Sequence, residues 1–203
     1  MVRRAISFVA VVAAVSVLAG ACNDSTGPEG AARVQIRLTD APSDYIASAE
    51  IWVSAVYLQR ADDDEEGDPR VFLFDDSDNP KHYDLMLLRD GVTADLTEAT
   101  DVEEGTYGQL RLVVDSAFVT LIEGVEFNAG GNTAMLKVPS GSSSGIKVLL
   151  EEPVAAEEGE TVVLLVDFDV DDNFRLQGNP ETPAGLSGIL FTPVLKEKSR
   201  TEE

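Results

Sequence analysis

Apolar and polar residues alternate along most of the chain after residue 32. In the segment RVQIRLTD, Val34, Ile36 and Leu38 fall on one face, and polar residues fall on the other. Strict alternation is the pattern of a half-buried β-strand. Similar segments follow at short intervals, nearly all bounded by Gly, Pro, Asn or Asp, at 49–59, 71–74, 110–116, 118–122, 125–129, 134–138, 146–150, 161–170 and 188–196.

This pattern predicts an all-β fold class. About ten short strands without a convincing amphipathic helix between them favour an antiparallel β-sandwich, immunoglobulin-like or prealbumin-like. The alternation slips within 49–59, which indicates a bulge there. One short helical turn is expected, at 85–95 or at 42–46. The acidic run at 61–69 is expected to be a solvated hairpin loop, because like charges are costly to pack together.

Two turn signals repeat before predicted strands. Glu-Glu-Gly occurs at 103–105 and at 157–159 in the chain, and Gly105 and Gly159 can adopt a positive φ without steric cost. Tyr107 follows the first of these turns. A tyrosine at such a corner packs its ring beneath the turn and donates its hydroxyl to a backbone group. We therefore assign Tyr107 to the fold and not to a site.

The N-terminus has the features of an export signal. Arg3 and Arg4 precede an apolar run at 5–18, which is too short for a bilayer span of about 20 residues. Residues 1–21 are therefore predicted to be a signal peptide. Two processing routes stay open: ordinary cleavage after the A-x-A sequence at 19–21, or acylation of Cys22, since 18–22 resembles a bacterial lipobox.

Cys22 is the only cysteine of the chain and so cannot form an internal disulfide. We favour it as the lipid anchor over a free, oxidisable thiol. Residues 22–32 would then form the anchor and a flexible tether. Residues 33–196 are predicted to form a single β-sandwich domain, and 197–203 a charged C-terminal tail.

The chain is strongly acidic, with a formal net charge of −22. This charge argues against nucleic-acid binding, which needs clustered basic residues, and against lying flat on anionic lipid. It fits solubility at a crowded surface, and it also leaves divalent cation binding open.

Six segments, taken together, resemble a known family. They occupy 38–42, 82–91, 105–117, 138–148, 164–170 and 190–196. Their order and spacing are similar to the bacterial and archaeal family known as domain of unknown function 4382, from residue 33 to about 196. The resemblance implies a secreted protein or lipoprotein with a β-sandwich-like domain, and it supplies no catalytic residues. The acidic insertion at 62–68 and the loop at 128–132 depart from the family pattern.

An acidic segment, DFDVDDN, is the candidate metal site. If it continues a strand, alternate aspartates project from one face about 7 Å apart, as hard oxygen ligands suited to Ca²⁺. It is not an EF-hand, because the required Gly and Glu are absent. The alternative is a solvated acidic edge that deters strand pairing. The candidate ligands are Asp167, Asp169, Asp171, Asp172 and Asn173, with Asp40 and Asp44 as further donors that the sequence does not place nearby.

No catalytic residue is predicted. His82 is the only histidine, and we expect it on the surface at a strand start. Paired carboxylates for glycoside hydrolysis cannot be chosen among 37 acidic residues. The serine-rich segment 140–145 lacks the ending of a phosphate loop. Trp52, Tyr57 and Phe174 could stack on a sugar, but we expect Trp52 in the core.

The sequence thus predicts an exported, lipid-anchored protein of the cell envelope, at the periplasm or the cell surface. Its domain is expected to be a non-catalytic binding or adhesion module with a protein or carbohydrate ligand, and Ca²⁺ as a candidate cofactor. The lipid on Cys22 would attach the protein to the membrane. The alternative is a structural envelope lipoprotein that acts through protein contacts. A binding module should show an exposed aromatic and polar patch.

Overall fold

The computed structural model describes residues 31–61, 68–139 and 144–203, and these residues form mostly β-strands. The all-β prediction is confirmed. The strands are β1 (Ala32–Thr39), β2 (Ile46–Arg60), β3 (Arg70–Asp75), β4 (Lys81–Asp84), β5 (Ala94–Asp95), β6 (Thr100–Val102), β7 (Gly105–Leu121), β8 (Thr133–Leu136), β9 (Ile146–Leu149), β10 (Val154–Ala156), β11 (Thr161–Asp167), β12 (Phe174–Asn179), β13 (Gly185–Phe191) and β14 (Leu195–Glu202). Two short helices lie wholly within the described residues, the 3-10 helix η1 (Leu85–Leu87) and α2 (Val170–Asn173).

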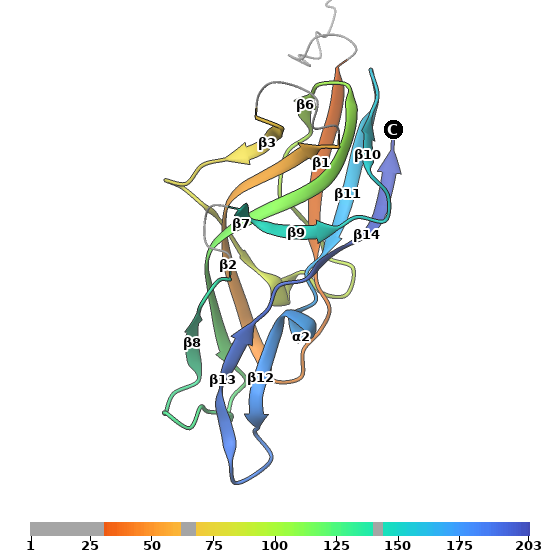
Figure 1. Ribbon diagram of the computed structural model, residues 1–203. Coiled ribbons are helices and arrows are strands. Elements are labelled where there is room, and N and C mark those ends of the chain that lie inside the picture. The colour runs from red at the N-terminus through yellow and green to blue at the C-terminus, as the bar shows by residue number, and fades with distance from the viewer. Residues whose placement is uncertain (1–30, 62–67, 140–143) are drawn as a thin grey trace, which may run out of the picture.

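Twelve strands form one sheet that curls strongly on itself (Figure 1). Its main order is β3-β2-β7-β9-β14-β11-β1-β5, and β12 and β13 form a separate hairpin at one end. The sheet is mixed and not purely antiparallel, because β1 pairs with β11 in parallel, as does β9 with β14. These partners lie far apart in sequence, so the long connections that parallel pairing requires are available. The particular immunoglobulin-like or prealbumin-like arrangement stays a prediction.

Strands β2 and β7 form a long, bent antiparallel ribbon along the molecule (Figure 1). The two strands predicted at 110–116 and 118–122 are one strand, β7. The predicted bulge in β2 is confirmed, since the register shifts between Trp52 and Val53 and again between Val53 and Ala55. Bulges increase local twist, which allows such a long ribbon to bend around the core.

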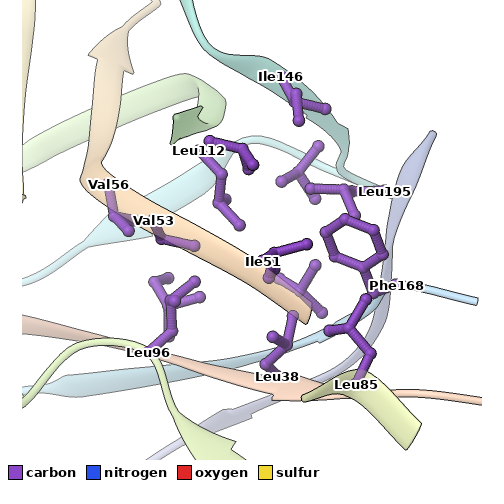
Figure 2. Close-up of a cluster of buried hydrophobic side chains, with 14 of the residues drawn as sticks. Leu38, Ile51, Val53, Val56, Leu85, Leu96, Leu112, Ile146, Phe168 and Leu195 are labelled. Carbon is purple, nitrogen blue, oxygen red and sulfur yellow. The ribbon is translucent and has the colours of Figure 1, made fainter. Parts of the chain in front are cut away.

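The core lies inside the curl of the sheet (Figure 2). The inward positions of β2 and β7 alternate as the sequence predicts, and Ile51, Val53 and Leu112 are fully buried. Leu38 and Leu195 meet them from the other side of the curl, beside Phe168. Because this core uses one face of the ribbon, the opposite face of β2 and β7 is left for other contacts.

The predicted corner at Tyr107 is confirmed. Its ring is buried and its hydroxyl donates a hydrogen bond of 2.7 Å to the carbonyl oxygen of Glu103. Gly105 and Gly159 both have positive φ, at 151° and 81°. The expected helical turn is η1, where the Asp84 side chain accepts a hydrogen bond from the N–H of Met86.

Several predicted boundaries are wrong. Residues 125–129 do not form a strand, and 188–196 divides into β13 and β14 around Pro193, whose missing N–H interrupts the strand. The expected tail at 197–203 belongs mostly to β14, which pairs with β11. Its backbone completes the sheet, and most of its charged side chains are exposed. Glu197 is an exception, because its side chain is only 4% exposed and forms an ion pair with Arg200 at 2.9 Å.

The predicted signal peptide, Cys22 and most of the tether lie outside the described residues, as do 62–67 of the acidic run and 140–143 of the serine-rich segment. Within the described ranges, no helix is long and apolar enough to cross a membrane.

Candidate functional site

The aspartate segment does not continue as a strand. Strand β11 ends at Asp167, and the chain turns into α2, so the expected row of aspartates on one strand face is wrong. Asp169 has a φ of 27° and accepts a hydrogen bond from the N–H of Asp172 at the start of α2. Aspartate tolerates this strained backbone because its short polar side chain can cap the next turn. The spacing of apolar residues in the sequence does not reveal such a turn.

The members of this segment have separate partners. The Asp167 carboxylate lies 3.3 Å from the Lys198 ammonium, and the Asp172 carboxylate lies 3.5 Å from that of Lys196. Both lysines come from β14, of which the sequence predicted only 195–196 as strand. The acidic residues therefore serve at least in part to balance the charge of a neighbouring strand.

Asn173 is fully buried and holds the α2 turn to the following segment. Its side-chain amide donates hydrogen bonds to the carbonyl oxygens of Phe168 and Asp169, the latter at 2.8 Å, and its carbonyl oxygen accepts from the N–H of Val194. The side-chain amide of Asn173 is therefore occupied by hydrogen bonds within the fold. No group of three or more His, Cys, Asp or Glu residues in the described part of the chain is placed to hold a metal ion. These contacts do not test Ca²⁺ binding directly, but the pairing of Asp167 and Asp172 with lysines argues against it.

Asp40 is brought to this region from the end of β1. It is 3% exposed, its Oδ1 accepts a hydrogen bond of 2.8 Å from the N–H of Val170, and its Oδ2 is buried without a partner. Burial raises the pKa of Asp40 to about 7, although backbone N–H bonds from Ala41 and Val170 oppose the rise. The negative charges of Asp167 and Asp169 raise the pKa further. Asp44, the other expected donor, is exposed.

A groove of about 650 Å³ lies on the face of β2, β3 and β7 that points away from the main core. A volume of this size falls in the range of small-molecule binding sites. The groove mixes aromatic, charged and hydroxyl-bearing side chains. It is lined by Ser54, Ala55, Tyr57, Arg70, Phe72, Asp75, Ser77, Val113 and Asp115.

The floor of the groove is apolar. Ala55, Tyr57 and Val113 are buried and form a small hydrophobic cluster of their own, separate from the main core. The Phe72 ring is 38% exposed and lies 5.3 Å from the Tyr57 ring, inclined by 45°. The Tyr57 hydroxyl donates a hydrogen bond of 2.8 Å to the carbonyl oxygen of Ser144, which fixes the ring. An apolar surface with one partly open ring is therefore held in place.

Arg70 closes one end of the groove. Its guanidinium carbon lies 5.8 Å from the centre of the Tyr57 ring and 5.5 Å from that of Phe72. Its Nε and Nη2 donate to the Asp68 carboxylate, the latter at 2.6 Å. Among the described residues, the N–H groups of Nη1 and the second N–H of Nη2 have no hydrogen-bond acceptor and can meet a ligand. The ion pair and the two rings together restrict the guanidinium to one orientation.

Two carboxylates mark the other end. Asp75 pairs with Ala55 in the sheet, whereas Arg70 pairs with Gln59, so the acidic end lies further along β2. Beside Ala55, the Ser54 hydroxyl donates a hydrogen bond of 2.7 Å to Asp115. Asp75 and Asp115 are both exposed at the groove and can accept hydrogen bonds from a ligand.

The aromatic surface continues along the same outer face. Trp52 is only partly buried, so its predicted place in the core is wrong. Because Ile51 and Val53 point inward, Trp52 points outward, where its ring lies 4.4 Å from His82 and 5.4 Å from Phe118. His82 lies on the surface in β4, as predicted, with Nε2 3.5 Å from the carboxylate of Glu50.

Of the three aromatics considered for sugar stacking, only Tyr57 lines the groove. Phe174 is buried and packs against Phe191, with ring centres 4.8 Å apart. The sequence pattern alone did not single out Arg70, Phe72 or the two carboxylates. The alternation within β3, where exposed Phe72 precedes buried Leu73, could have indicated that Phe72 points outward. The pairing of β3 with β2, which places Phe72 beside Tyr57, becomes known only from the fold.

Comparison with known proteins gives one match. The profile of the family described as Domain of unknown function (DUF4382) matches residues 31–182, and therefore includes every residue that lines the groove. Neither a curated protein nor a solved structure matches the chain.

Proposed function

Since the chain belongs to the family described as Domain of unknown function (DUF4382), we propose its function from its own residues: an exported, lipid-anchored envelope protein that binds a ligand non-catalytically. The ligand would occupy the groove of β2, β3 and β7. Cys22 would carry the lipid, and the tether would hold the domain away from the membrane.

The observation that carries the proposal is the groove itself. Phe72 is a large apolar side chain left partly open beside ordered polar groups, above a floor of buried apolar residues. Convergence of an aromatic surface with a few fixed donors and acceptors is typical of a ligand site. Its lining residues include neither histidine nor cysteine, and we assign no nucleophile or general base among them.

The binding function can be tested on insoluble envelope material from the bacterium that carries the gene, stripped of membrane with detergent. Full-length protein purified in detergent should bind this material saturably. Phe72→Ala should weaken binding at least tenfold, because it removes the open aromatic contact. Leu190→Ala is the matched control, since Leu190 is 48% exposed on the distant β13 hairpin. Binding that does not saturate, or that Phe72→Ala leaves unchanged, would contradict the proposal.

The anchor can be tested by labelling with radioactive palmitate in a bacterial host. The full-length chain should incorporate label and fractionate with membranes, and Cys22→Ser should lose both properties, because no other cysteine is present. Label retained by Cys22→Ser, or a wild-type chain found without label in the soluble fraction, would overturn the anchor.

A further inference from the structure

The two ends of the groove carry opposite charges. Arg70 and Asp75 begin and end β3, about 17 Å apart at the usual rise of a strand. Asp115 joins Asp75 at the acidic end, and Asp68 already pairs with Arg70 at the other. The groove is therefore long enough for an extended ligand, and its polar groups differ from one end to the other.

This charge pattern disfavours ligands of either sign. An anionic ligand would approach two carboxylates on a protein whose net charge is −22. A cationic ligand at the Tyr57 and Phe72 rings would lie close to the Arg70 guanidinium, which already contacts both rings, and the two positive charges would repel each other. The exposed carboxylates alone would hold a cation weakly, because water screens such pairs.

A neutral ligand rich in hydroxyl groups meets none of these penalties. A hydroxyl group both donates and accepts hydrogen bonds, so it can pair with the carboxylates of Asp75 and Asp115, with the Arg70 guanidinium and with the Ser77 hydroxyl. The exposed part of the Phe72 ring offers an apolar surface for the C–H face of a sugar ring, and the groove floor of Ala55, Tyr57 and Val113 beside it is apolar too.

We infer that the groove binds a neutral glycan in an extended form, with its sugar rings against Phe72 and its hydroxyl groups between Arg70 and the two carboxylates. This inference rests on the proposed binding function and names its ligand class. A folded protein partner fits less well, because a stable protein interface is much wider than one groove of this volume.

The first arm of the test separates glycan from protein ligands. Envelope material is digested exhaustively with proteinase K, the protease is inactivated, and binding of the full-length chain is measured again. A glycan ligand predicts that saturable, Phe72-dependent binding survives. If digestion abolishes binding that was saturable and Phe72-dependent before, the glycan inference falls while the binding function stands. If undigested material shows no such binding, the proposed function itself fails.

The second arm tests the charge of the ligand with soluble competitors. Neutral chito-, cello- and malto-oligosaccharides are compared with deacetylated chito-oligosaccharides, which are cationic, and with oligogalacturonate, which is anionic. We expect a neutral series to compete at least tenfold better than its charged counterpart. Competition that favours either charged series would overturn the inference. Asp115→Asn keeps a hydrogen-bonding group and should retain neutral glycan binding better than Asp115→Ala, a difference that simple unfolding would not produce.

Discussion

The two faces of the β2–β7 ribbon differ in what their residues are for. On the inner face, Ile51 and Leu112 are fully buried in the main core, and folding explains their presence. On the outer face, Trp52 and Asp115 are partly or largely exposed, as is Phe72 of the adjacent strand β3, and none of the three belongs to the main core. The contrast shows that the two faces of the same strands can carry the core and a candidate site.

The largest difference between the faces should appear in stability. Leu112→Ala empties a fully buried position on the inner face and should lower the free energy of unfolding by about 2–5 kcal/mol. Urea unfolding measures this loss. Thr120→Ala, on the outer face of the same strand, should cost less than about 1 kcal/mol. Equal losses from the two substitutions would remove the distinction between the faces.

A second difference should depend on pH. Asp40 is buried, and its folded pKa of about 7 lies above the ordinary value of 3.8, so the folded state holds its proton more tightly than the unfolded state. Its contribution to stability is complete below about pH 4 and is lost as the pH rises through about 7. Asp40→Asn should therefore stabilise the protein at pH 8, by up to about 4 kcal/mol, and change little at pH 4.

Urea unfolding at both pH values measures this effect. Asp44→Asn serves as the control, because Asp44 is an exposed aspartate of the same segment. An unchanged stability difference between pH 4 and pH 8 for Asp40→Asn would contradict the role of its buried, unpartnered oxygen.

A smaller effect is expected at the Tyr107 corner. Tyr107→Phe removes the hydrogen bond to the Glu103 carbonyl oxygen and should cost about 0.5–1.5 kcal/mol. Tyr83→Phe removes a comparable bond to the Asp95 carbonyl oxygen at an exposed site and should cost less. Equal costs, measured by urea unfolding, would show that burial does not strengthen the corner.

The smallest effect is expected from Ca²⁺. Because Asp167 and Asp172 pair with lysines of β14, added Ca²⁺ should raise the thermal unfolding midpoint no more than Mg²⁺ at equal ionic strength. A rise specific to Ca²⁺ that is lost in Asp169→Ala with Asp171→Ala would restore the metal site that the sequence predicted.

Much of the fold could be predicted from the sequence because inward and outward residues alternate. This pattern located β1, β3 and most of β2, and the turn chemistry located the Tyr107 corner. The alternation pattern failed where a segment looks like an exposed tail in sequence but forms a strand of the sheet in the fold. Alternating charges at 197–203 suggested a tail, although the backbone there completes the sheet beside β11.

The candidate site was less accessible from sequence. Its residues come from three strands, and the strand register that aligns Asp75 with Ala55 is a long-range property. Trp52 was assigned to the core because apolar neighbours surround it in sequence, but the strand period directs it outward. The residue type of Asp40 marks it as a candidate ligand, and only the fold shows that it accepts a hydrogen bond from the N–H of Val170.

We propose that the outer face binds a ligand while the inner face maintains the fold. The decisive experiment measures the dissociation constant for envelope material and the free energy of unfolding on the same preparations of wild type and Phe72→Ala. We expect at least tenfold weaker binding with a free energy of unfolding changed by less than about 1 kcal/mol. Unchanged binding, or a loss of binding that only follows a comparable loss of stability, would contradict the proposal.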